Sequence, residues 1–362
     1  MTNKIKTFGL FLFIAIGEIA SGQSDKERAL SKAQEAVKLM DNGKIEESIK
    51  LLKESQKLDP ARFDYIYEMA YAYHLKDNNK EVVKILEKHR NHKDVTERYF
   101  QLLGNTYDVL DKSDKAFEIY DLGLQKFPNS GMINLEKGNV HWNKKEYGKA
   151  LPYYEKGIEV DPKFPSNYYR AARIYCSSTE EVWGMIYGEL FMNLERNSER
   201  TSEISKLLYD TYKSQIMFSS DTSFSVSFSK NVTISIEDLN APDKFKLPFG
   251  VGVYEQTLMF SMLSAKNIDI NSLDKIRSKF IDNYFKEGHN KTYPNILFTY
   301  QKQVKDVGHI EAYNHWILMK GDEDGFEKWQ TANTVKWDSF IKWFGDNGLK
   351  INNSNKFYSG QY

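Results

Sequence analysis

The chain has 362 residues and carries no net charge at pH 7, because its 50 basic side chains balance its 50 acidic ones. A neutral chain lacks the basic surface that nucleic-acid binding requires, and it also lacks a polybasic tether to a membrane. The single cysteine, Cys176, cannot form a disulfide within the chain, so the fold must be held by apolar burial, and this length suffices for two hydrophobic cores.

Residues 1–22 have the order of an export signal. Lys4 and Lys6 precede an apolar run at 8–16, and small residues follow at 20–22. The apolar run is too short to span a bilayer, and small residues are typical of a cleavage site. We therefore predict an exported protein, periplasmic or extracellular in a bacterium, with no integral membrane segment once the signal is removed. Retention of the segment as an N-terminal membrane anchor is the alternative.

From residue 29 onward, a small residue, an aromatic residue and a proline recur with a period of 34 residues. In the clearest copies the small residues are Gly104 and Gly138, and Tyr120 and Tyr154 follow them at equal spacing. The small-residue frame also extends outward to Ala36, Ala70 and Ala172. A small residue is needed where one helix of a hairpin lies against the next, and a proline after the second helix ends it because proline has no N–H. Agreement over five frames indicates five helical hairpins.

This spacing resembles that of the tetratricopeptide repeat family, over residues 29–196. The resemblance implies a mostly α fold, a right-handed α-solenoid of about five hairpins, each made of a helix A and a helix B. The second repeat is degenerate, with Asp94 where other repeats have proline, and the fifth loses the pattern in its second half. Stacked hairpins of this kind leave a concave groove that is expected to bind other chains rather than to catalyse a reaction.

In this family the groove is lined mainly by helix A, and the corresponding positions here form a candidate binding site for a peptide or protein partner. They are Tyr67, Tyr71, His74, Asn105, Asn139, Trp142, Tyr169, Arg170 and Arg173. Asparagine amides can donate to and accept from an extended peptide backbone, and two arginines can receive a carboxylate. Ordinary solvated residues of a groove are the alternative. The clamp that some members use for a chaperone's terminal carboxylate is disfavoured, since Glu136 would repel that group.

Beyond residue 196 the period is lost, and we predict a second, mainly helical domain over 197–362 that carries one β-hairpin and resembles no family we recognise. The runs 224–228 and 232–236 alternate apolar and polar residues, which is typical of strands. A three-residue loop at 229–231 places every apolar side chain of the two runs on one face. An isolated hairpin is only marginally stable, so this face must lie on helices.

Those helices are indicated by three apolar stripes. The first covers 273–285, with Asn271 as its expected N-cap; the others cover 310–317 and 337–344. Four tryptophans lie in this closing stretch: Trp316, Trp329, Trp337 and Trp343. The regular stripe that begins at Trp337 favours a core role for them, with Trp343 the candidate for exposure. An exposed aromatic platform, for instance for sugar rings, is the alternative.

The sequence contains no recognisable catalytic motif. His309 and His315 are six residues apart, which on a helix places them roughly 120° apart and not on one face. Gly250 and Gly252 read as a turn into a helix that begins near Tyr254. We therefore predict no metal, no cofactor and no enzymatic activity, and a non-enzymatic scaffold or adaptor in the cell envelope. An enzyme or carbohydrate-binding protein, with its site in the second domain and the repeats used for assembly, is the alternative.

Overall fold

The computed structural model describes residues 24–220, 223–230, 248–263 and 265–362. The predicted signal at 1–22 and the predicted strand at 232–236 lie outside this described part. Contacts within the chain divide it into two compact units, one ending at Val95 and the other beginning at Thr96. We describe each unit by itself.

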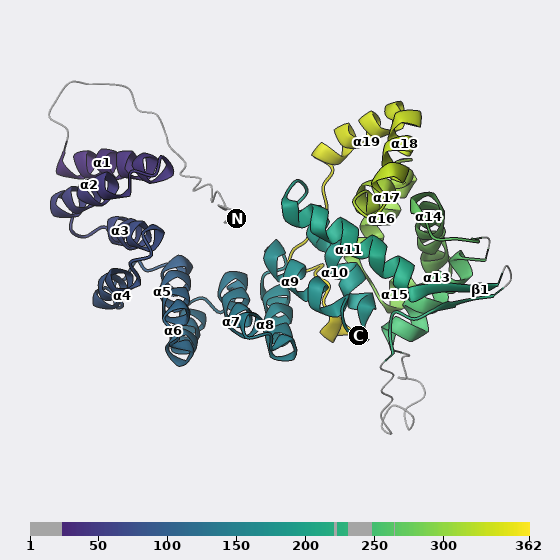
Figure 1. Cartoon of the computed structure of the whole chain (residues 1–362), viewed down its shortest axis with the longest axis horizontal. Helices are drawn as coiled ribbons and strands as arrows, with labels where there is room; N and C mark the ends of the chain where they lie inside the picture. Colours follow the sequence, from purple (N-terminus) through teal and green to yellow (C-terminus); the bar gives the residue numbers. More distant parts are fainter. Residues whose placement is uncertain (1–23, 221–222, 231–247, 264) are drawn as a thin grey trace. The chain divides into compact units, whose positions relative to one another are not determined.

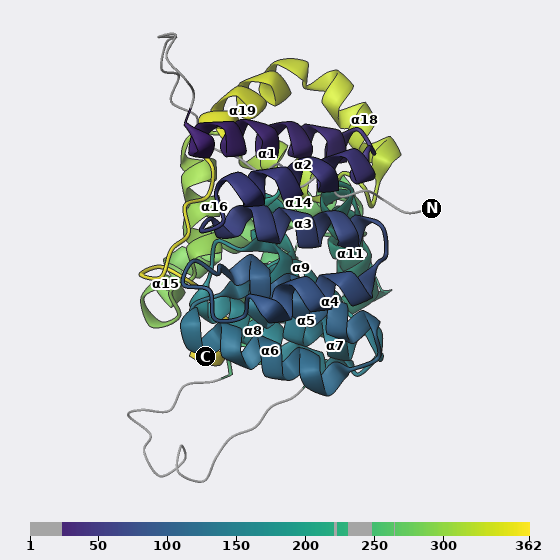
Figure 2. The ribbon, with the colours of Figure 1, turned by 90° about the vertical axis from the view of Figure 1, so that its left-hand side faces the viewer.

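The described part of the first unit, residues 24–95, consists of two helical hairpins, in which successive helices pack against one another (Figure 2). Ser24 begins the first helix with a capping box, in which its hydroxyl accepts from the N–H of Glu27 and the Glu27 carboxylate accepts from the N–H of Ser24. Ala36 and Ala70, the small residues of the 34-residue frame, are fully buried between helices. The helices are α1 (Asp25–Asp41), α2 (Ile45–Leu58), α3 (Phe63–Leu75) and α4 (Asn79–Lys88).

The second unit begins with three more hairpins, which are the third, fourth and fifth repeats (Figure 1). A Cβ atom added at Gly104 would lie 2.2 Å from Cε1 of Tyr120, and one at Gly138 would lie 2.4 Å from Cε1 of Tyr154. Each glycine is therefore required by the tyrosine that helix B packs against it, which explains their shared period. The helices are α5 (Glu97–Val109), α6 (Ser113–Lys126), α7 (Gly131–Asn143), α8 (Tyr147–Val160), α9 (Pro165–Tyr175) and α10 (Glu181–Leu194).

The turn from helix A to helix B repeats its backbone conformation as well. Gly43, Asp77, Asp111 and Lys145 all have a positive φ, between 56° and 76°, and they are spaced 34 residues apart. A left-handed residue lets the chain reverse directly after helix A, and it costs a residue with a Cβ about 1 kcal/mol. The backbone conformation therefore follows the repeat period although the side chain changes from glycine to aspartate to lysine.

This conformation gives a prediction for Lys145 and Gly43. Lys145→Gly should raise the free energy of unfolding by up to about 1 kcal/mol, because glycine adopts a positive φ without a steric cost. Gly43→Ala should lower it by about the same amount, and crowding cannot be the cause, since nothing lies within 4 Å of the added Cβ. Chemical denaturation measures both changes. Equal stability of Lys145→Gly and the parent chain would contradict the role given to this turn.

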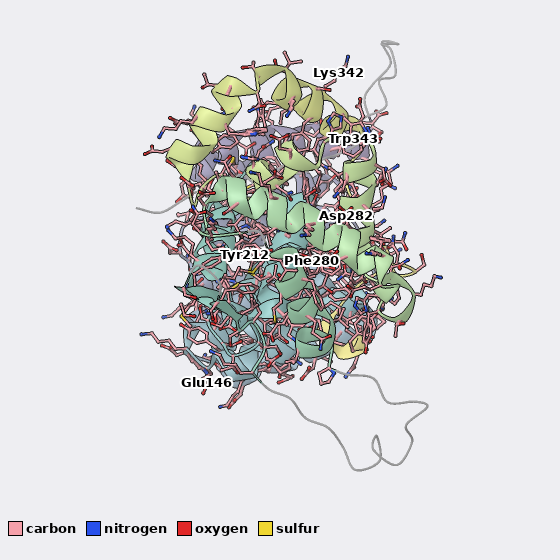
Figure 3. All side chains as sticks on the ribbon, turned by 90° about the vertical axis from the view of Figure 1, so that its right-hand side faces the viewer. Glu146, Tyr212, Phe280, Asp282, Lys342 and Trp343 are labelled. Carbon is pink, nitrogen blue, oxygen red and sulfur yellow. The ribbon has the colours of Figure 1, made fainter. Side chains whose placement is uncertain are left out.

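The rest of the second unit is mainly helical and shares one hydrophobic core with the fourth and fifth repeats. This core contains buried residues from Leu135 to Phe357, so the predicted boundary between residues 196 and 197 lies inside it. Helix α14 crosses one face of the unit, with Phe280 turned inward and Asp282 exposed (Figure 3). The elements are α11 (Glu199–Gln215), β1 (Ile216–Ser220), β2 (Ser223–Val226), the π-helix η1 (Gly250–Glu255), α13 (Gln256–Ser261), α14 (Ile270–Lys286), α15 (His289–Thr292), α16 (Ile296–Asp306), α17 (Ile310–Leu318), α18 (Glu323–Ala332), α19 (Thr334–Asp346) and the 3₁₀ turn η2 (Ser359–Gln361).

The observed β-hairpin has a different partner strand from the predicted one. Strand β2 pairs antiparallel with β1, which precedes it, and Phe224 lies opposite Phe218. The strand ends at Val226, and the N–H of Phe228 donates to the Glu255 carboxylate instead of to a neighbouring strand. The apolar residues of β1, at 216–218, are consecutive and not alternating, and they follow directly on helix α11, so the sequence pattern did not reveal this strand. The pairing predicted for 232–236 falls outside the described residues.

Two local predictions are wrong and one is confirmed. Helix α14 begins at Ile270 with Asp269, not Asn271, as its N-cap, because the Asp269 carboxylate accepts from the N–H of Ser272 at 2.7 Å. The predicted turn at Gly250 is already helical, as the start of η1. The tryptophans pack in or against the core: Trp316 and Trp329 are buried, and Trp337 and Trp343 are half-buried.

Candidate functional site

The helices A of the second unit form a continuous face. Helix α5 contacts α7, α7 contacts α9, and α9 contacts α11. Side chains join neighbouring helices along this face: the Gln101 amide donates to Glu136 Oε1 at 2.7 Å, and the Arg200 guanidinium donates to the Ser166 hydroxyl at 3.0 Å. We call the polar surface of α5, α7, α9 and α11 the helix-A face.

Two asparagines of the helix-A face are oriented by tyrosines from helix B. Asn105 Oδ1 accepts from the hydroxyl of Tyr120, and Asn139 Oδ1 accepts from the hydroxyl of Tyr154 at 3.1 Å. Both tyrosines are buried, and burial raises the pKa of each hydroxyl far above its ordinary value, so each remains a donor. A donor on Oδ1 fixes which side of each amide carries the NH₂ group. Asn139 donates this group to Glu136 Oε2 at 3.0 Å.

An aromatic and arginine cluster occupies the α7–α9 part of the face. The guanidinium carbons of Arg170 and Arg173 lie 4.6 and 5.0 Å from the centre of the Trp142 ring, a cation–π arrangement. Arg173 also donates to the hydroxyl of Tyr169 at 3.0 Å. Within the described part of the chain, Arg170 has no hydrogen bond and no ion pair. Its nearest contacts there are ring faces, and burial lowers its pKa from the ordinary value although the charge of the Glu136 carboxylate acts in the opposite direction.

The remaining predicted residues lie in the first unit, on helix α3. The rings of Tyr67 and Tyr71 are stacked with centres 6.5 Å apart, and the Tyr71 ring lies 6.1 Å from that of His74. Burial lowers the pKa of His74, so its imidazole is neutral at pH 7. The structure thus brings six of the nine predicted residues onto the helix-A face of the second unit and places the other three in a separate row.

Helix α11 is a part of the face that the sequence pattern missed. We assign it as a sixth helix A, because its side-chain hydrogen bonds to α9 join residues that are 34 positions apart. Tyr169 donates to the carboxylate of Glu203, and Arg200 donates to the hydroxyl of Ser166. The small-residue frame fails here, since position 206 is a lysine, and this ended the predicted repeats near residue 196. The aromatic frame does continue, from Tyr175 to Tyr209, and it is the signal that could have found this helix.

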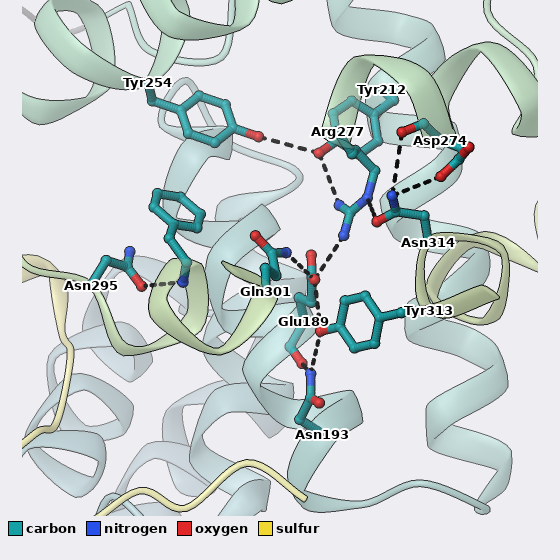
Figure 4. A network of polar contacts seen from close by, with 11 residues as sticks. Glu189, Asn193, Tyr212, Tyr254, Asp274, Arg277, Asn295, Gln301, Tyr313 and Asn314 are labelled. Carbon is teal, nitrogen blue, oxygen red and sulfur yellow. Dashed lines mark hydrogen bonds and ion pairs between the residues drawn. The ribbon is translucent and has the colours of Figure 1, made fainter. Parts of the chain in front are cut away.

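A second candidate is a buried polar network where α10 meets α14, α16 and α17 (Figure 4). Glu189 and Arg277, which are 3% and 6% exposed, form an ion pair at 2.7 Å. Glu189 Oε1 also accepts from the hydroxyl of Tyr313 at 2.9 Å and from the Gln301 amide. Burial opposes the charge of Arg277, but the Glu189 carboxylate outweighs it, and the pKa of Arg277 lies above its ordinary value.

The outer part of this network satisfies the guanidinium. Arg277 donates from Nε to the amide oxygen of Asn314 at 2.9 Å and from a terminal nitrogen to the hydroxyl of Tyr212 at 3.2 Å. A cavity of about 20 Å³ lies among Tyr212, Tyr254 and the ion pair. This is room for one water molecule and not for an organic substrate.

His309 and His315 do not form a metal site together. His315 is buried, its Nδ1 lies 2.8 Å from the backbone oxygen of Glu311, and its ring stacks on Trp329 with centres 4.0 Å apart. Among the described residues, no group of three or more histidine, cysteine or acidic side chains is placed to hold a metal ion. The same residues contain no helix that is long and apolar enough to cross a membrane.

Comparisons with known proteins agree with the helical hairpins. The family model of the tetratricopeptide repeat matches residues 133–164, which include most of α7 and α8. The TPR repeat-containing protein YpiA of Bacillus subtilis (strain 168) is 23% identical over 137 residues, which are 38% of this chain; the match spans only 32% of that protein's length.

Solved structures of similar fold have lower identity. The structure of Pseudomonas aeruginosa PilF covers 52% of this chain and 85% of its own, with a TM-score of 0.44 and 17% identity. YrrB, described as a TPR protein with an unusual peptide-binding site, covers 48% of this chain and 89% of its own, with a TM-score of 0.34 and 17% identity.

Proposed function

Because this chain is a tetratricopeptide-repeat protein, we propose that it is a non-enzymatic interaction scaffold that binds a peptide segment of a protein partner along the helix-A face. The observation that carries this proposal is the cluster of Trp142, Arg170 and Arg173. Arg170 is a half-buried cation held by aromatic rings, and it has no ion pair within the described residues. A half-buried charge of this kind gains most from a partner that brings hydrogen-bond acceptors to it.

The rest of the face supports a peptide as the ligand. Gln101, Glu136 and Asn139 form a linked row of polar groups that run from one helix A to the next. An extended backbone presents N–H and C=O groups at regular intervals, and a rigid row of amide and carboxylate groups can pair with them. Tyr67, Tyr71 and His74 form a separate candidate contact row within the first unit. If residues 1–22 act as an export signal, the partner lies in the cell envelope or outside the cell.

The site can be tested by removing the two cations of α9. Arg170→Gln with Arg173→Gln should weaken partner capture at least tenfold, since both guanidinium groups lie in the proposed contact. The matched control is Lys149→Gln with Lys156→Gln, which removes the same charge from exposed positions on helix B of the fourth repeat. Cross-linking in the native envelope fraction, followed by pull-down and quantitative mass spectrometry, compares the two. Equal loss of partners from both variants would show a general effect of charge and contradict the site.

Asparagine is a poorer choice for that test. Asn139→Ala would leave the buried hydroxyl of Tyr154 without its acceptor, which costs about 1–3 kcal/mol of folding free energy. A loss of binding in this variant could then come from a loss of structure. Arg170→Gln avoids the problem, because Arg170 makes no hydrogen bond within the described residues. Arg173→Gln removes the bond that Arg173 donates to the Tyr169 hydroxyl, but this hydroxyl still donates to the Glu203 carboxylate.

A further inference from the structure

Residues 349–362, called here the 349–362 segment, follow α19 and return to the repeats. In Figure 1 this segment is the yellow trace that leaves α19 and ends near α9 and α10. Apart from the short turn η2 it has no helix and no strand. It is held through a few side chains, of which Ile351 and Phe357 are buried. Between them, residues 352–355 form a turn, of which 352–354 are exposed.

Its polar anchor is the half-buried carboxylate of Glu155 on helix B of the fourth repeat. Glu155 Oε1 accepts from the hydroxyls of Ser359 and Tyr175, both at 2.7 Å, and Oε2 accepts from Tyr187 at 2.6 Å. The backbone N–H of Ser359 donates to the Tyr187 hydroxyl at 2.7 Å. Ser359 therefore completes a hydrogen-bonded group that α8, α9 and α10 have already assembled.

Its apolar anchor is the ring of Phe357. This ring is fully buried, with its centre 6.1 Å from that of Trp183 on α10 and 6.2 Å from that of Phe249 beside η1. Two flanking contacts fix the direction of the chain. Lys356 donates to the backbone oxygen of Glu159 at 2.7 Å, and Tyr362 donates to that of Pro294 at 2.8 Å.

These contacts are those of a bound linear peptide: one aromatic residue in a pocket, one hydroxyl on a half-buried carboxylate, and a covalent link through an exposed turn. We propose that the helix-B side of the fourth and fifth repeats is a second peptide-binding surface, whose ligand is the 349–362 segment, bound in cis and exchangeable. Its specificity comes from the Phe357 ring and, two residues later, the Ser359 hydroxyl. The surface is separate from the helix-A face, and its test needs no knowledge of the partner bound there.

The experiment cuts the link after the protein has folded. A site-specific protease sequence is placed in the exposed turn at residues 352–354, the folded full chain is cleaved, and a fluorescent synthetic peptide of residues 355–362 is added. We expect saturable one-to-one binding, with circular dichroism unchanged by cleavage. An unlabelled peptide of the same sequence should displace the probe. The Phe357→Ala peptide should compete at least tenfold more weakly, and the Ser359→Ala peptide several-fold more weakly.

Other outcomes would overturn the proposal. Unfolding on cleavage, or no exchange with the labelled peptide, would make the segment a fixed part of the core. Equal competition by the Phe357→Ala and parent peptides would remove the basis of specificity. If the inserted sequence itself prevents folding, hydrogen exchange of the uncut chain decides: in Ser359→Ala, exchange in 355–362 should become several-fold faster while exchange in α14 is unchanged. Unchanged exchange in 355–362, or equal acceleration in both regions, would contradict a separately releasable segment.

Discussion

Replacement of Arg277 by methionine is expected to lower the free energy of unfolding by about 3–5 kcal/mol, a large share of the stability of a typical domain. Methionine keeps much of the apolar volume but leaves the Glu189 carboxylate buried without its cation. Glu189 lies on α10, and its donors Gln301 and Tyr313 lie on α16 and α17. The substitution therefore weakens the contact between the fifth repeat and the helices that follow it. Chemical denaturation followed by tryptophan fluorescence measures it.

Two controls separate the buried charge from the loss of packing. In the double variant Glu189→Gln with Arg277→Met, the carbonyl of the new glutamine still accepts from Tyr313 and no charge remains, so a substantial part of the stability should return. Lys302→Met removes a cation from the partly exposed pair with Asp306 on α16 and should cost less than about 1 kcal/mol. A double variant no more stable than Arg277→Met alone would contradict the explanation by unpaired charge.

Replacement of Gly138 by leucine is expected to lower the free energy of unfolding by about 1–3 kcal/mol through overpacking. The first atom of any side chain at this position would lie 2.4 Å from the ring of Tyr154, and the rest would push α7 away from α8. The shift would also disturb Asn139, since Tyr154 is its hydrogen-bond donor. Thermal unfolding monitored by circular dichroism gives the change.

Gly148 on α8 is the matched control, because nothing lies within 4 Å of a Cβ added there. Gly148→Ala should raise the stability by about 0.5–1 kcal/mol, through the higher helix propensity of alanine. The two substitutions act on neighbouring helices of one repeat and should have opposite signs. If both substitutions raised the stability, the close approach of Gly138 and Tyr154 would not contribute to the free energy of unfolding, and the explanation by overpacking would be wrong.

The candidate site was predictable as far as the repeat period reaches. A fixed period assigns equivalent positions to equivalent places, so Asn105, Asn139 and Arg173 could be placed on helix A from the sequence. Their partners could not be assigned in the same way. The contact of Arg170 with Trp142 crosses from one repeat to the next, and the bond from Tyr120 to Asn105 depends on how helix B lies on helix A.

The sequence by itself determined the helical hairpins, since a period of 34 residues, glycines facing tyrosines and helix-ending prolines are local features that recur. The tertiary structure alone decided what lies beyond the period: α11 as a sixth helix A, β1 as the partner of β2, and the Glu189–Arg277 pair. These depend on contacts between residues far apart in the chain; Glu189 and Arg277 are 88 positions apart. Such a pair produces no periodic pattern in the sequence, because each of the two residues occurs once. The two residues come into contact only when the core forms around them.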